Sequence, residues 1–196
     1  MVGGVEMMGK LLVEQIQGKE IEKDSKLYEK IHHVKGENER LVMELNTGYK
    51  TQEEAHHYLE CITGTPIDST THVSLPFFTD FGKHITLGKR VFINQQVMFV
   101  DLGGITIEDD VLIGPMTRLI TVNHIQEVEK RRGLIVKPVL LKKNAWIGAN
   151  VTILPGVTIG ENSIVAADST VTKDVEPNVV VAGSPAKIVK RLTIDE

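Results

Sequence analysis

Branched aliphatic residues recur at every sixth position between residues 141 and 175. A period of six is neither the 3.6-residue period of a helix nor the two-residue alternation of a strand. It is typical of a solenoid in which each hexad adds one short strand and one corner. A second series, four positions after the first, holds small or β-branched residues suited to the corners. The first series is Leu141, Ile147, Ile153, Ile159, Val165 and Val171, and the second is Ala145, Val151, Val157, Ser163, Ser169 and Val175.

The same register is present earlier in the chain, at Leu87, Ile93 and Phe99, and again at Ile107, Ile113 and Leu119. A two-residue slip at 102–104 separates these two runs. The repeat is absent from residues 122–138, which are rich in charge. We therefore predict a loop that leaves the coil there, and loops on rigid scaffolds often carry functional sites.

Residues 1–64 do not follow the hexad pattern and predict a small helical appendage. Apolar residues at helical spacing predict one helix from Ser25 to a stop at 46–48, and a capping box at Thr51–Glu54 predicts a second that Gly64 closes. We expect Tyr58, Cys61 and Ile62 on the buried side of the second helix. At the other end, residues 179–181 predict a last strand. A short basic helix over 186–192 is expected to cap the core, which a solenoid cannot leave open.

The fold class predicted is thus mainly β: a helical appendage over 1–64 and a solenoid of short strands over 75–192, with a loop excursion at 122–138. The composition of the chain excludes some classes of binding partner. The 22 Lys and Arg against 26 Asp and Glu give a net charge of −4, which argues against a nucleic-acid partner. One cysteine excludes an internal disulfide. No apolar run reaches the roughly 18 residues of a membrane helix, and residues 1–12 lack a signal-peptide core, so we expect a soluble, cytoplasmic protein.

Several polar residues are candidates for chemistry. His124 begins the loop excursion, Asn94 follows an inward aliphatic, and Asp80 and Asp101 lie near the first coils. Taken singly, each fits an ordinary turn residue or a locally hydrogen-bonded histidine better than a catalytic group. They indicate a functional site only when they are considered together with the other sequence segments around them.

That pattern resembles the maltose and galactoside O-acetyltransferases of the hexapeptide-repeat acyltransferase superfamily. The resemblance covers about residues 75–192 and rests on a set of segments that occur together and in order. They are Pro76–Gly82, Ile93-Asn94 with Asp101, Ile113-Gly114-Pro115, His124, Lys137-Pro138-Val139, Trp146-Ile147-Gly148, Pro155–Gly160, Val171–Asp174 and Gly183–Lys187.

The resemblance implies a left-handed β-helix and a homotrimer whose three active sites lie between subunits. It implies acetyl-CoA as donor, a hydroxyl acceptor that is usually a sugar, and no metal. His124 would act as general base for direct attack on the thioester, without an acyl-enzyme. Asn94 would contact the oxyanion or the acceptor, and Asp80 and Asp101 would bind acceptor hydroxyls. The donor would be held by Ala149 and Ala167 along the pantetheine arm, Thr172 and Lys173 at the nucleotide end, and Lys187 and Lys190 near the phosphates.

Some positions depart from the family's pattern. Asp168 stands where relatives usually have glycine beside the pantetheine, and Leu102 replaces an aspartate that binds sugar in galactoside enzymes. Galactoside specificity is therefore open, and serine or an antibiotic is an alternative acceptor. Two further alternatives are a metal-dependent lyase of the γ-carbonic-anhydrase type, which needs three histidines around zinc, and a trimeric scaffold without activity.

Overall fold

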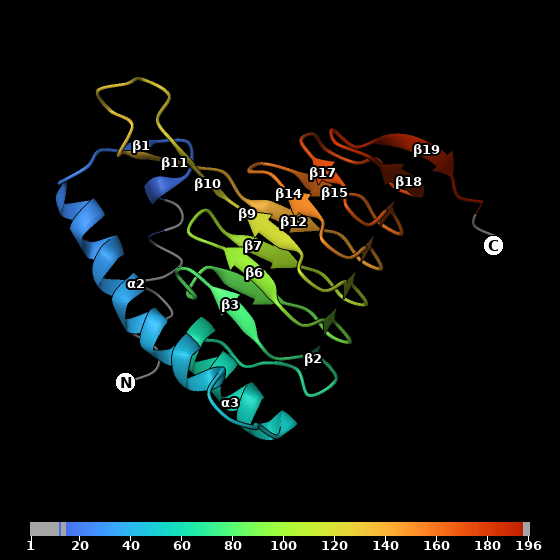
Figure 1. The fold of residues 1–196 in the computed structure, drawn as a ribbon, viewed down its shortest axis with the longest axis horizontal. Coiled ribbons are helices and arrows are strands. Elements are labelled where there is room, and N and C mark those ends of the chain that lie inside the picture. The colour runs from blue at the N-terminus through green and yellow to red at the C-terminus, as the bar shows by residue number, and fades with distance from the viewer. Residues whose placement is uncertain (1–11, 13–14, 194–196) are drawn as a thin grey trace.

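The computed structural model describes residue 12 and residues 15–193, which form a tapering stack of coils flanked by two helices (Figure 1). Residues 1–11, on which much of the signal-peptide argument rests, lie outside the described residues. The helices are α2 (Lys26–Leu45) and α3 (Gln52–Thr63). Within the described residues, no helix is long and apolar enough to cross a membrane.

Three sheets of mostly parallel strands form the walls of the coils, and the chain visits them in turn. The four-stranded sheet holds β4 (Ile85–Leu87), β7 (Ile105–Ile107), β12 (Val139–Leu141) and β15 (Thr158–Ile159). The five-stranded sheet holds β3 (Phe77–Thr79), β6 (Val97–Val100), β9 (Arg118–Ile120), β14 (Thr152–Ile153) and β17 (Thr170–Val171). The seven-stranded sheet holds β2 (His72–Val73), β5 (Phe92–Ile93), β8 (Leu112–Ile113), β13 (Trp146–Ile147), β16 (Ile164–Val165), β18 (Val179–Ala182) and β19 (Lys187–Arg191).

The hexad aliphatics form the core, as predicted. All six residues of the first series are at most 1% exposed, and Val151, Val157 and Val175 of the second series are buried with them. Parallel pairs such as Leu141 with Ile159 stack one coil on the next. The predicted β-helix is confirmed, because the period of six returns each aliphatic to the interior.

The two predicted helices are confirmed together with their caps. The Ser25 hydroxyl accepts from the Tyr28 amide at the start of α2, and Thr51 and Glu54 form the reciprocal capping box of α3. Gly64 ends α3 in the left-handed conformation, with φ of 74°. The expected burial of Cys61 is wrong: its side chain is exposed, and Ala55, Leu59 and Ile62 pack on the coils instead.

The capping helix predicted over 186–192 is wrong. Residues Lys187–Arg191 form β19, which pairs antiparallel with β18 at the end of the seven-stranded sheet. Gly183, with φ of 99°, turns the chain back on itself. The β-branched pair Ile188-Val189 favours a strand, and the pairing satisfies the backbone groups that β18 would otherwise leave open.

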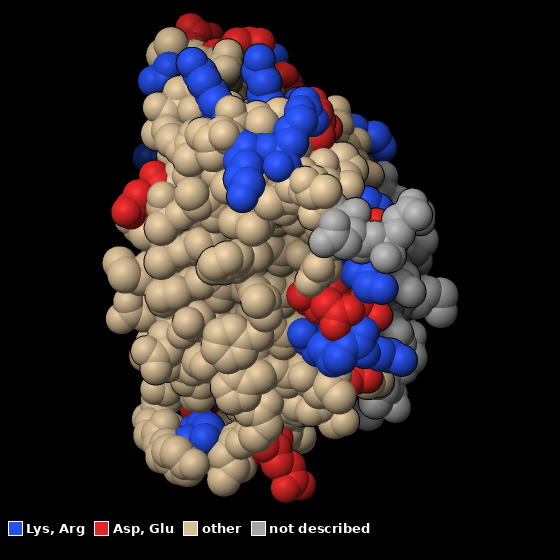
Figure 2. Space-filling model, turned by 90° about the vertical axis from the view of Figure 1, so that its right-hand side faces the viewer, with Lys and Arg blue, Asp and Glu red and all other residues tan. Residues whose placement is uncertain are grey.

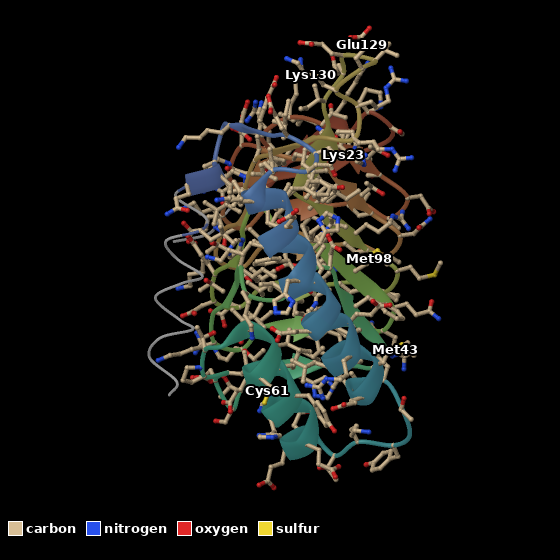
Figure 3. All side chains as sticks on the ribbon, turned by 90° about the vertical axis from the view of Figure 1, so that its left-hand side faces the viewer. Lys23, Met43, Cys61, Met98, Glu129 and Lys130 are labelled. Atoms are coloured by element: carbon tan, nitrogen blue, oxygen red, sulfur yellow. The ribbon has the colours of Figure 1, made fainter. Side chains whose placement is uncertain are left out.

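The excursion at 122–138 is a hairpin and not an irregular loop. β10 (Val122–His124) pairs antiparallel with β11 (Leu134–Val136), and β1 (Glu20–Ile21) adds a third strand. Leu134 and Val136 are buried in a second apolar cluster with residues from α2 and the first coils. Glu129 and Lys130 stand at the tip, away from the coils (Figure 3). The hairpin is therefore packed against the protein at its base, and its tip, residues 126–132, is exposed.

Candidate active site

His124 ends β10, at the point where the hairpin leaves the coil. Its backbone pairs with Leu134, and its ring is exposed with no hydrogen-bond partner among the described residues. The adjoining Thr121 is fully buried: its hydroxyl donates to the Val100 carbonyl and accepts from the Gly103 amide at 2.8 Å. The His124 ring thus projects into solvent from a backbone segment that the hydrogen bonds of Thr121 hold in place.

Asn94 occupies the corner between β5 and β6. The Gln95 amide donates to its Oδ1 at 2.8 Å, which fixes the orientation of the side-chain amide. No partner for Nδ2 is found in the described part of the chain. A fixed N–H donor without a protein acceptor is suited to binding an oxyanion or a ligand oxygen.

Asn94 opens into a groove of about 590 Å³ that also contains Ala149 and Ala167. Gly114 and Gly148 line the same wall, and a Cβ at either would come within 2.6 Å of the backbone nitrogen of the next coil. This wall must therefore consist of small residues, because the coils stack on it directly. The structure brings three of the predicted site residues together in one groove.

Lys187 and Lys190 face the same side of the seven-stranded sheet as this groove. Lys190 pairs with Val180, which pairs in turn with Ile164, and Ile164 lines the groove. Paired residues of neighbouring strands point to the same face. Both lysines are exposed. Figure 2 shows the side of the molecule on which β18 and β19 lie, a broad uncharged expanse with Lys and Arg side chains gathered above it.

Asp80 lies elsewhere, at the end of β3 beside α2. Its carboxylate forms a 2.6 Å ion pair with Lys35. The side chain of Lys35 is 23% exposed and that of Asp80 is 32% exposed. The pair lies in a second groove, of about 620 Å³, which includes Phe78, Met98 and Met43 among its lining residues. Met43 and Met98 lie on the same side of the molecule, beside α2 (Figure 3). Lys35 could not have been found from the sequence, since 45 residues separate it from its partner.

The acceptor-binding role predicted for Asp101 is wrong. The side chain is 0% exposed, and its Oδ1 accepts from the Thr79 hydroxyl at 2.6 Å and the Phe81 amide at 2.9 Å. Burial raises the pKa of the Asp101 carboxyl above its ordinary value, and these hydrogen bonds offset part of the rise. A carboxyl group enclosed in this way fastens β3 to β6 and cannot reach a ligand.

The remaining candidates fall at opposite ends of the five-stranded sheet. Asn94, Ala149 and Ala167 each precede one of its strands by three residues, at the amino ends. At the carboxyl ends, Asp80 follows β3, Thr172 and Lys173 follow β17, and His124 comes four residues after β9.

The candidate residues at the amino ends of the five-stranded sheet lie far from those at its carboxyl ends. Asn94 lies six residues before Val100, which pairs with Ile120, and His124 is four residues further on. At about 3.3 Å per residue, the six residues from Asn94 to Val100 alone span on the order of 20 Å, and the four residues from Ile120 to His124 add to the separation within one chain. One copy of the chain therefore cannot place both on the same reacting group.

Metal-binding side chains do not gather at either end. Across the described residues, no three His, Cys, Asp or Glu side chains come close enough to hold a metal ion together. The candidate site residues comprise an exposed imidazole, an oriented amide, two alanines in a groove and exposed lysines.

Comparisons with known proteins agree with this fold. The family described as bacterial transferase hexapeptide (six repeats) matches residues 138–173. Galactoside O-acetyltransferase of Escherichia coli strain K12 is 34% identical over 154 residues, which are 78% of this chain and 76% of the relative. Relatives from Schizosaccharomyces pombe and Saccharomyces cerevisiae are 38% and 40% identical over 63% and 60% of this chain, and the match spans 61% of each of them.

A solved structure agrees over nearly the whole chain. The hexapeptide-repeat containing acetyltransferase from Vibrio cholerae superposes with a TM-score of 0.80 at 33% identity, covering 94% of this chain and 99% of that one. That protein has also been solved in complex with acetyl-CoA. The similarity includes the helical region as well as the coils.

Proposed function

The chain belongs to the hexapeptide-repeat acetyltransferases, and on this basis we propose that it transfers an acetyl group from acetyl-CoA to a hydroxyl of a sugar or related small molecule. The observation that carries the proposal is the groove, in which an oriented amide at Asn94 stands beside the small residues Ala149 and Ala167. Small side chains along part of this groove leave room for an extended arm. The acetyl-CoA complex of the Vibrio cholerae relative supports this donor.

The donor would lie with its phosphates toward Lys187 and Lys190 and its thioester toward Asn94. Lysine ammonium groups bind phosphate as point charges. Thr172 and Lys173 lie at the opposite end of the five-stranded sheet, so they would reach this donor from a neighbouring copy.

The active site would form between two copies of the chain, in a homotrimer. His124 and Asp80 of one copy would face Asn94 and the groove of the next. This arrangement would bring together residues that lie about 20 Å or more apart within a single chain. Asp80 would accept a hydrogen bond from the acceptor, with Lys35 holding its carboxylate in place at 2.6 Å. The site would then be incomplete in an isolated chain.

The reaction would proceed by direct attack. His124 would take the proton of the acceptor hydroxyl as the oxygen attacks the thioester carbonyl carbon, a step for which a positioned base contributes about 10²–10⁴-fold. Asn94 Nδ2 would donate to the oxyanion of the tetrahedral intermediate. Collapse would break the C–S bond, and the imidazolium would return its proton to the leaving thiolate.

The test is release of the CoA thiol in the presence of a panel of sugars, serine and other small alcohols. We expect wild-type turnover with at least one of them, and a loss of about 10²–10⁴-fold in kcat for His124→Ala with unchanged affinity for CoA. His33→Ala is the matched control, because His33 is an exposed histidine on α2, 78% accessible. Equal turnover by wild type and His124→Ala would remove this histidine from the mechanism.

A further inference from the structure

Trp146 is a large apolar side chain that the core does not use. It lies on β13 next to Ile147, and the two point to opposite faces of the sheet. Ile147 is completely buried, whereas the indole of Trp146 is 51% exposed. The indole Nε1–H has no acceptor among the residues that the structure describes. Exposed aromatic surface with an unused donor is typical of a contact surface.

The neighbours of Trp146 make a continuous apolar row across the coils. Trp146 pairs with Leu112 on one side and with Ile164 on the other, and Leu112 pairs with Phe92. Leu112 is 45% and Phe92 37% exposed. Phe92, Leu112, Trp146 and Ile164 line the same groove as Ala149 and Ala167.

The groove is therefore lined by two unlike sets of residues. One set offers flat apolar surface and a single N–H donor, and the other offers only small side chains. Its ends also differ, with the Asn94 amide at one end and the sheet face bearing Lys187 and Lys190 toward the other. An extended chain with methylene groups, amide carbonyls and a phosphorylated end matches each of these features.

We propose that Trp146 is a donor-binding residue, whose indole packs along the pantetheine arm and whose Nε1–H donates to an amide carbonyl of that arm. The inference rests on the proposed function, because it takes CoA as the occupant of the groove. It adds a role for the row of exposed apolar residues, of which Trp146 is the largest.

The experiment uses the fact that Trp146 is the single tryptophan of the chain. Tryptophan emission of the full-length protein is followed during titration with CoA, and calorimetry measures the dissociation constant independently. The variants are Trp146→Ala, which removes the indole, and Trp146→Phe, which keeps an aromatic surface but removes the N–H. Tyr49→Ala is the control, since Tyr49 is an aromatic side chain 90% exposed outside the groove.

We expect CoA to change the emission of the wild type, and Trp146→Ala to weaken CoA binding by roughly tenfold or more. Trp146→Phe should weaken it by a smaller factor, and Tyr49→Ala should leave it unchanged. CoA binding to the wild type with no emission change and no loss in Trp146→Ala would overturn the inference and leave the proposed function intact. No CoA binding to the wild type would refute the proposed function itself.

Size-exclusion chromatography with light scattering tests whether a second copy of the chain, and not the donor, contacts Trp146. The inference expects Trp146→Ala to keep the mass of the wild-type assembly. A loss of assembly in this variant would identify the indole as a subunit contact and contradict the donor role.

Discussion

Asp101 is a carboxyl group enclosed by protein, and this environment sets its properties. Because burial raises the pKa of Asp101, the folded protein keeps its proton over a range of pH in which the unfolded chain has lost it. The folded state binds more protons in that range. Its stability relative to the unfolded chain therefore falls as pH rises from about 4 to the raised pKa, and then levels off.

Asp101→Asn should remove this dependence, since asparagine has a similar shape and does not ionise. Urea unfolding at a series of pH values from 4 to 8 should show the variant gaining stability over the wild type as pH rises through the window. Glu161→Gln, at an exposed position, is the control and should track the wild type. Parallel curves for Asp101→Asn and the wild type would show that Asp101 is not held protonated.

Only some of the individual residue environments could be predicted from the sequence. The repeat places His124 and Asn94 at notable positions, but their roles and those of Ala149 and Ala167 were suggested only by the resemblance to a family. The burial of Asp101 and the pairing of Asp80 with Lys35 could not, because both depend on how α2 and the first coils pack together. Identical side chains in similar turns thus have different roles.

Glycine has different meanings in different elements of this fold. Gly36 lies inside α2 with open space around its α-carbon, and it adds only conformational freedom to the unfolded chain. Gly148 lies at a coil corner, where a Cβ would stand 2.6 Å from the Ala167 nitrogen and 2.9 Å from the Val165 carbonyl oxygen. The first glycine is dispensable, and the second is required for the coils to stack.

Gly36→Ala should therefore stabilise the protein by about 0.5–1 kcal/mol. Gly148→Ala should destabilise it by about 1–3 kcal/mol, because two backbones must move apart. Thermal or urea unfolding of the two single variants measures both effects, and each serves as the control for the other. A neutral Gly148→Ala would mean that the corner tolerates a side chain and that the wall of the groove is not fixed.

Elements with strong local signals were predictable, and those decided by tertiary pairing were not. The cap residues Ser25 and Thr51 mark both helices in the sequence, and the hexads mark the coils. Residues 187–191 hold a β-branched pair that favours a strand, but so short a segment does not exclude a helix by itself. The open edge of β18 decides between them, and this edge exists only once the coils are stacked.

At the scale of the whole molecule, the candidate residues lie at two separate ends of the five-stranded sheet, so in the proposed assembly one chain would contribute to two different sites. The amino ends of the five-stranded sheet carry the groove and Asn94, and the carboxyl ends lead to His124 and the Lys35–Asp80 pair. A closed ring of copies brings unlike ends together at every interface, which a head-to-tail arrangement with rotational symmetry achieves. The stacked coils could be predicted from the period of six, but the number of copies depends on surfaces that the repeat does not specify.

The most direct test mixes two inactive chains. His124→Ala and Asn94→Ala are each expected to abolish most activity, by about 10²-fold or more. If each site takes its histidine from one copy and its asparagine from the next, random co-assembly of equal amounts leaves about one site in four intact. The account therefore predicts that co-refolded or co-expressed chains recover roughly a quarter of wild-type kcat per site, while each variant alone stays inactive. Mixed assemblies, verified by mass, that show no activity above that of the separate variants would contradict it.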